Sequence, residues 1–367
     1  MRYSYKLILV LLSLFFVHSL PAQDCRDVLR RAVELYEKGH LNEVREVLAD
    51  ACIQVLPTEK DKEEAYYLLA VANLYMKNLD SAKVALLTIL RKNPEYVCKQ
   101  KSPLGFQKYY ETFKTTPAFI IGGSIGLNTS EIKSIKAYTL DQANVGKEGT
   151  YKKVFGFQAH GTAMLPLTPR IYLVGEFGFK HFAYEFENTQ FGYSKVRFRE
   201  RQNWLELPAM IRYNFGNPYV FKDNKKFIEK LNPYIVVGAS GTFLLGSTAL
   251  AFRQDDAKSD RALDLTSQVN MNAMRHTWGY YAIVGGGMEY KNGRAIWSLA
   301  CKYTIGLADV VKSKTRYDNQ NLLFSYGYID SDIKFRNLTF SLGLTYPIYN
   351  PRQHKKFHIE DLEPIEK

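Results

Sequence analysis

Segments of about ten residues with two-residue alternation fill the last two-thirds of the chain. In the clearest segment, residues 119–128, odd positions are mostly large and apolar, whereas even positions are largely Gly, Ser and Asn. A soluble, half-buried strand would place charged residues on its second face. Small, weakly polar residues suit a narrow barrel interior instead, and about 9–11 residues is the length that a tilted strand needs to cross a bilayer. The pattern predicts transmembrane β-strands, which close into barrels in outer membranes.

Eight such segments can be placed after residue 117. They lie at 118–128, 153–165, 170–184, 202–215, 233–246, 278–290, 295–306 and 336–348. Short links alternate with long polar ones, which lie at 129–152, 185–201, 247–277 and 307–335. The link at 216–232 is the one exception, because it is long where a short link is expected. A short amphipathic helix is expected within it, at 221–231. Outer-membrane barrels alternate long external loops with short periplasmic turns in this way. The fold predicted is an eight-stranded antiparallel transmembrane β-barrel with both ends in the periplasm.

Residues 24–116 follow a helical period instead. Apolar positions three or four residues apart recur in residues 32–48 and again in residues 66–89, and Pro94 closes the second unit. These units resemble tetratricopeptide repeats, in which small residues let paired helices touch. Two units fall below the roughly three that normally support a free-standing solenoid. The region is predicted to be a periplasmic helical-hairpin domain that serves either as a spacer or as a protein-binding groove.

The N-terminus has the three parts of a secretory signal peptide. Basic Arg2 and Lys6 precede an apolar run, and a short cleavage region ends near Gln23. The run is shorter than the roughly 18 apolar residues that a membrane anchor needs. The predicted organisation is a signal peptide at 1–23, a helical domain at 24–116, a barrel at 117–349 and a basic, solvated periplasmic tail at 350–367.

Charge is spread unevenly along the chain. The formal net charge is +12, yet residues 24–116 hold 15 Lys and Arg against 14 Asp and Glu, so most of the excess lies in the barrel and its links. A basic rim on the barrel suits contact with anionic lipid headgroups. Nucleic acid is a poor fit as a partner, because no binding motif is present and the expected compartment holds none.

The four cysteines lack the paired spacing of a zinc site. Cys25 opens the first helix of the first repeat and Cys52 closes the second, so in an antiparallel hairpin the two would meet within disulfide reach. Cys98 follows the second repeat and competes for Cys52, and three free thiols are the remaining alternative. Cys301 alternates outward on its strand and is expected to be an unpaired, lipid-facing thiol.

Three strand segments together resemble the PorT-like outer-membrane β-barrel family of Bacteroidota. Residues 204–215, Trp-Leu-Glu-Leu-Pro-Ala-Met-Ile-Arg-Tyr-Asn-Phe, are similar to its Leu-Glu-(Ile/Leu)-Pro…(Lys/Arg)-Tyr-x-Phe pattern. Residues 285–290 resemble its Gly-x-Gly-x-Glu strand, and residues 302–310 its basic-Tyr…Gly-Leu-x-Asp strand. The similarity covers about residues 117–349. It implies a barrel in the outer membrane, but it implies no activity, since most members have no assigned role.

Strand parity sends a set of ionisable side chains into the barrel interior. They are His160, Glu176, Lys180, Glu206, Arg212, Glu289 and Lys302. Eight strands enclose an interior just wide enough for side chains to fill, and buried charges there must be paired. We expect Glu206, Arg212, Glu289 and Lys302 to form one network, with Arg212 beside Glu206. The network is either a plug that closes the pore or, alternatively, a proton or ion path.

No residues stand out as catalytic, cofactor-binding or metal-ligating. Residues 122–126 match Gly-x-Ser-x-Gly, but a nucleophile elbow needs a strand-to-helix turn and this motif lies within a strand. The predicted function is a structural or scaffolding role in the outer membrane, without enzyme activity or cofactor, in which the helical domain binds a protein of the envelope or secretion machinery. The alternatives are a narrow channel and a small barrel enzyme acting on lipid or protein.

Overall fold

The computed structural model describes residues 20–48, 50–99, 102–141, 149–216, 231–255 and 263–362. The chain divides into two compact units, one formed by residues 1–116 with 349–367 and the other by residues 117–348. Most of the predicted signal peptide lies outside the described residues, and so does the helix expected at 221–231.

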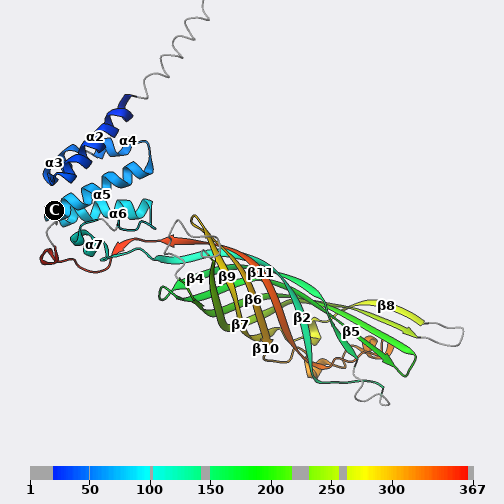
Figure 1. Ribbon diagram of the computed structural model, residues 1–367. Helices are drawn as coiled ribbons and strands as arrows, with labels where there is room; N and C mark the ends of the chain where they lie inside the picture. The colour runs from blue at the N-terminus through cyan, green and yellow to red at the C-terminus, as the bar shows by residue number, and fades with distance from the viewer. Residues whose placement is uncertain are drawn as a thin grey trace, which may run out of the picture. The chain divides into compact units, whose positions relative to one another are not determined.

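The first unit consists of helices that share one apolar core (Figure 1). They are α2 (Leu20–Glu37), α3 (Leu41–Val47), α4 (Asp50–Val55), α5 (Glu59–Tyr75), α6 (Leu79–Lys92) and α7 (Leu104–Tyr110). N-cap side chains define where α5 and α6 begin: Thr58 Oγ1 accepts from the Asp61 N–H at 3.0 Å, and Asn78 Oδ1 accepts from the Ser81 N–H at 3.2 Å. The apolar stripe of α6 then buries Leu86 and its neighbours in the core.

The end of the chain belongs to this same unit. Strand β12 (Arg352–Gln353) pairs with β1 (Phe113–Lys114), and the Phe357 ring lies 5.0 Å from the ring of Tyr109. A short 3-10 helix, η6 (Ile359–Asp361), follows. The sequence predicts a separate solvated tail at 350–367. Residues 350–362 differ from that prediction, because Phe357 and Leu362 pack against the helical core. The basic side chains at 354–356 are exposed, as expected for a solvated segment.

The second unit is an antiparallel sheet that closes on itself (Figure 1). Its strands are β2 (Pro117–Lys136), β3 (Thr150–Lys153), β4 (Phe155–Pro166), β5 (Ile171–Gln190), β6 (Ser194–Asn214), β7 (Leu231–Asp255), β8 (Leu263–Asn270), β9 (Trp278–Asn292), β10 (Ala295–Gly306) and β11 (Asp332–Tyr349). Pairing runs from β2 through β4, β5, β6, β7, β9, β10 and β11 back to β2, with β3 added to β5 and β8 to β7. The sheet is therefore a barrel without open edges over most of its height.

Strand β6 shows how the sequence alternation becomes an inside and an outside. Even positions from Trp204 to Met210 are buried in the barrel, whereas Leu205, Leu207 and Ile211 on the other face are partly or largely exposed. Exposed apolar side chains of this kind recur on the outer faces of the other barrel strands. A surface band of this composition is stable against the hydrocarbon of a membrane, and it agrees with the transmembrane strands that the sequence alternation predicts.

Several strands run well beyond the lengths predicted from sequence, all at the end of the barrel opposite to the start of β2. We call this the loop end. Residues 185–201, which read as a polar link, form the continuation of β5 and β6 and turn at Phe191 and Gly192, whose φ angles are 54° and 77°. The interior of the loop end holds an aromatic core that includes Phe182 and Phe198.

Two of the long links fold into that core instead of extending away from it. The link before β9 contributes Met271 and Met274, the latter in the 3-10 helix η3 (Asn272–Met274). The link before β11 contributes Leu322, Tyr326 and Tyr328, around η4 (Ser313–Thr315) and the π-helical turn η5 (Asn321–Ser325). Apolar side chains within these mostly polar links explain why they cover the barrel mouth.

Candidate functional site

The interior of the barrel contains the predicted charged residues, arranged in separate groups. In the first group, Glu206 of β6 accepts from Lys180 of β5 at 3.5 Å and from Ser240 of β7 at 3.3 Å. The ring nitrogen Nε2 of His160, on β4, lies 3.2 Å from the other Glu206 oxygen. His160 was left without a partner in the sequence prediction. The sheet provides one because β4 and β6 both pair with β5, so that inward side chains at one level meet over it.

A second group joins strands that are distant in sequence. Lys302 of β10 donates to both oxygens of Glu176, on β5, at 2.6 and 2.7 Å. The two residues are 126 positions apart. The bidentate contact leaves neither charge unpaired, as a buried ion pair requires.

The third group corrects the predicted pairing of Arg212 with Glu206. Arg212 Nη2 lies 2.5 Å from Oε1 of Glu289, on β9, and its Nε donates to Asn214 at 2.7 Å. The guanidinium also stacks 3.4 Å from the centre of the Tyr234 ring. The prediction was wrong because Arg212 and Glu206 share one strand and one face but stand six positions apart, whereas β7 leaves room for Arg212 to reach β9.

Little space remains between these groups. A cavity of about 40 Å³ lies among Glu176, Arg212, Tyr234 and Lys302. That volume accommodates one or two water molecules, not a hydrated ion in transit. At this level the interior is a packed set of ion pairs.

A second charged cluster, at the loop end, was not predicted from sequence. Arg275 donates to both oxygens of Glu200, at 2.8 and 2.6 Å, and to both oxygens of Asp330, each at 2.8 Å. Tyr184 and Tyr328 donate to the same carboxylates at 2.6 and 3.0 Å. All three charged side chains are at most 1% exposed. Burial lowers the pKa of Arg275, but Asp330 and Glu200 outweigh it and hold that pKa above its usual value.

No local pattern distinguishes these residues in the sequence. Arg275 and Asp330 lie in two different links, and Glu200 lies in a segment that itself reads as a link. The cluster connects the links before β9 and β11 to strand β6. It is a structural clamp on the material that fills the barrel mouth.

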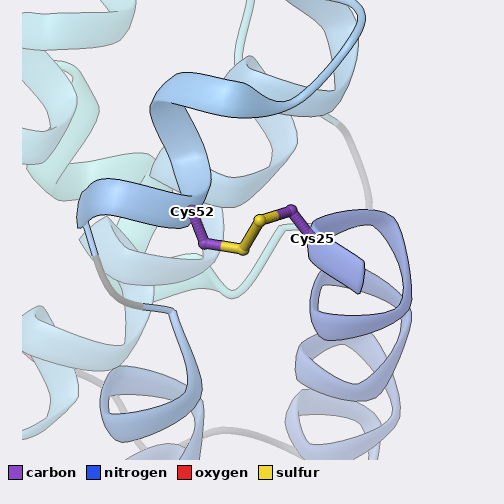
Figure 2. Close-up of a disulfide and its surroundings, with 2 residues drawn as sticks. All are labelled: Cys25 and Cys52. Atoms are coloured by element: carbon purple, nitrogen blue, oxygen red, sulfur yellow. A yellow bond between two sulfur atoms is a disulfide. The ribbon is translucent and has the colours of Figure 1, made fainter. Parts of the chain in front are cut away.

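In the helical unit, Cys25 and Cys52 form a disulfide (Figure 2). The bond joins α2 to α4, and the two Cα atoms lie 5.4 Å apart. Cys98 and Cys301 are free thiols. Burial raises the pKa of the Cys98 thiol above its usual value.

None of the helices in the described part of the chain is long and apolar enough to cross a membrane. Among the same described residues, no group of three or more His, Cys, Asp or Glu side chains is placed to hold a metal ion.

Comparison with known proteins concerns the barrel. A family model described as an outer membrane protein beta-barrel domain matches residues 117–312. No curated protein matches the chain. Among solved structures, Neisserial surface protein A is 12% identical and matches over 63% of this chain and 97% of its own, with a TM-score of 0.27. OprG of Pseudomonas aeruginosa is 12% identical and matches over 64% of this chain and 97% of its own, with a TM-score of 0.29. The attachment invasion locus protein Ail of Yersinia pestis is 14% identical and matches over 62% of this chain and 99% of its own, with a TM-score of 0.25.

Proposed function

The chain belongs to the outer membrane protein beta-barrel domain family, and from this premise we propose that it is a non-enzymatic membrane anchor for its helical unit. The helical unit lies in the periplasm and binds a protein of the envelope or secretion machinery. The barrel itself conducts nothing. The loop end faces the outside of the cell, and the signal peptide directs export.

The filled barrel interior is the observation that carries this proposal. Glu176, Glu206 and Glu289 each have a basic partner inside the barrel, and the cavity among these groups measures about 40 Å³. A conducting path would have to break at least one buried ion pair, and breaking such a pair costs about 3–5 kcal/mol. A barrel closed in this way supports the anchor over the narrow channel.

The strand pairing supports the proposed membrane topology. An eight-stranded barrel has both ends on one side, and the two-residue connection Gly293-Arg294 between β9 and β10 is typical of a periplasmic turn. The PorT-like resemblance of residues 204–215 agrees with this arrangement. The strand extensions and the covered mouth then lie outside.

The helical unit supports partner binding through its size and its exposed positions. Its helices form tetratricopeptide-like hairpins, of which α5 and α6 make one, below the roughly three repeats of a self-sufficient solenoid. The Cys25–Cys52 disulfide compensates for the missing repeats by restricting the unfolded chain. Val84 and Val97, 66% and 70% exposed, leave apolar surface available to a partner.

Site-specific photocrosslinking in intact cells tests the proposal. A photoreactive residue at Val84 or Val97 is expected to capture a periplasmic or envelope protein, identified by mass spectrometry. The matched control is Ile125, 67% exposed on the lipid-facing side of β2, where capture of that protein is not expected. Absence of protein adducts at both helical positions, or reproducible single-channel conductance of the purified chain in planar bilayers, would overturn the proposal.

A further inference from the structure

Strand β6 carries a row of basic residues on the outside of the loop end. Lys195, Arg197, Arg199 and Arg201 occupy every second position, and the alternate positions between them are buried in the loop-end core. Because alternation along a strand keeps one face constant, the row continues the face that carries Leu205 lower on the same strand.

The row begins where the apolar band ends. Outward positions of β6 from Leu205 toward Tyr213 are mostly apolar, Asn203 is the single polar position between, and Arg201 is the first cation. Four residues of a strand tilted about 40° rise roughly 10 Å along the membrane normal. The headgroup layer is roughly 5–7 Å thick, and an arginine side chain is long enough to reach back into it. Arg201 therefore reaches the headgroup layer. Arg199, two residues and about 5 Å further out, reaches its outer edge, while Arg197 and Lys195 lie beyond it.

The nearby carboxylates are engaged by other cations. Glu187 lies 2.5 Å from Lys152 and 3.1 Å from Arg197, and Glu185 lies 3.6 Å from Arg197. Arg197 is also held over the ring of Phe252, 5.5 Å from its centre. The outermost acids of β5 thus neutralise the far part of the row.

Arg199 and Arg201 are left without such partners. Among the described residues neither makes an ion pair, and Arg199 Nε is shielded from solvent with no hydrogen-bond acceptor. Arg201 stands opposite Ala183 on β5 and Thr248 on β7, which offer no charge. Arg199 stands opposite Glu185, but that carboxylate is paired with Arg197. Two neighbouring guanidinium groups without an ion-pair partner therefore leave positive charge directly above an apolar surface, where an anion from outside the chain can neutralise it.

We propose that Arg199 and Arg201 form a binding site for the phosphate group of an anionic lipid whose acyl chains pack on Leu205 and Leu207. Guanidinium groups bind phosphate oxygens in a bidentate fashion, and attraction of a basic side chain to an anionic membrane surface is on the order of fivefold in affinity per charge. A soluble anion would not need the apolar surface below. The proposal rests on the membrane-spanning barrel of the proposed function, but on neither its orientation nor a protein partner.

Native mass spectrometry of the detergent-solubilised full-length chain tests the site. The probes are phosphatidylglycerol and phosphatidylcholine, which share the phosphodiester but differ in net charge. The chain is expected to bind phosphatidylglycerol in preference, and the double change Arg199→Gln with Arg201→Gln is expected to weaken that binding about 20-fold, with little effect on phosphatidylcholine. Both side chains point away from the core, so the variant is expected to fold.

The matched control is the double change Lys133→Gln with Lys334→Gln. It removes the same charge from the outer faces of β2 and β11 at the loop end, and heat-modifiable gel mobility verifies that both variants fold. Equal loss of lipid binding in both variants, or no loss in the arginine variant, would overturn the proposal. If dextran sulfate, added at a charge equal to that of the lipid, displaced the bound phosphatidylglycerol, the proposal would also be overturned, because the site would then bind soluble polyanions. Each of these outcomes is independent of whether the helical unit captures a protein.

Discussion

The guanidinium of Arg275 holds both carboxylate oxygens of Glu200, at 2.8 and 2.6 Å, across 75 residues of sequence. Asp330 accepts from Nη1 and Nη2 of the same guanidinium, each at 2.8 Å, and Nη1 also donates to the Met274 carbonyl at 3.4 Å. One buried cation thereby connects strand β6 with the two links that cover the barrel mouth. Removal of any member leaves a charge in an environment that water does not reach.

Replacing Arg275 with Met is expected to destabilise the loop end by about 3–5 kcal/mol, because two carboxylates then remain buried without a cation. The measurement is limited proteolysis of the folded chain, in which the links before β9 and β11 become the first sites of cleavage. The triple change Arg275→Met, Glu200→Gln and Asp330→Asn is the control, and it should recover much of the loss. A triple variant as labile as the single one would contradict the clamp.

Inside the barrel, Arg212→Ala is expected to destabilise the fold by about 3–5 kcal/mol, because Glu289 loses its cation. Adding Glu289→Ala should restore part of the stability, measured by urea unfolding in detergent micelles. Adding Glu206→Ala instead should not, since Glu206 keeps Lys180 and His160. If the Glu206 change rescued as well as the Glu289 change, the structural pairing would be wrong.

The outer face of the barrel is tested at Leu342, which is 50% exposed on β11. Leu342→Arg near the bilayer midplane is expected to cost about 2–4 kcal/mol, because the charge faces hydrocarbon. Heat-modifiable gel mobility in lipid reports the loss. The controls are Leu342→Phe, which keeps the face apolar, and Ser341→Ala on the inward face. Tolerance of arginine at Leu342 equal to that of these controls would contradict the assignment of this face to lipid.

The disulfide of the helical unit closes a loop of 27 residues. Chain-entropy reasoning assigns such a loop about 3–4 kcal/mol, so Cys25→Ser with Cys52→Ser should lower the thermal midpoint of the helical unit. Peptide mapping without reductant gives the direct measurement. Alkylation is expected at Cys98, slowly at neutral pH because burial raises the pKa of its thiol, and not at Cys25. A peptide joining Cys52 to Cys98, or full alkylation of Cys25, would refute the pairing.

Local periodicity was enough to predict that the barrel is built of transmembrane β-strands and which of their side chains face inward or outward. The alternation through residues 204–211 distinguishes buried Glu206 from outward Leu205 and Leu207, since successive side chains of a strand face opposite ways wherever the strand pairs. The hairpin between β9 and β10 was likewise indicated by Asn292-Gly293, although Asn292 ends the strand and the two turn residues are Gly293, with a φ of 59°, and Arg294. These features depend on neighbours in sequence alone.

Partner identity and the shape of the loop end were decided only by the closed sheet. Arg212 meets Glu289, and Lys302 meets Glu176, because strand order and register determine which inward side chains share a level. The extended strands and the clamp at Arg275 could not be predicted from sequence, because the links that contain them are mostly polar and show no distinct pattern. A few apolar side chains in these links pack into one core only in the folded barrel. Alternation is a property of one strand, so the chain specifies it locally. An ion pair between distant strands is a property of the assembled barrel, so only the tertiary structure selects its members.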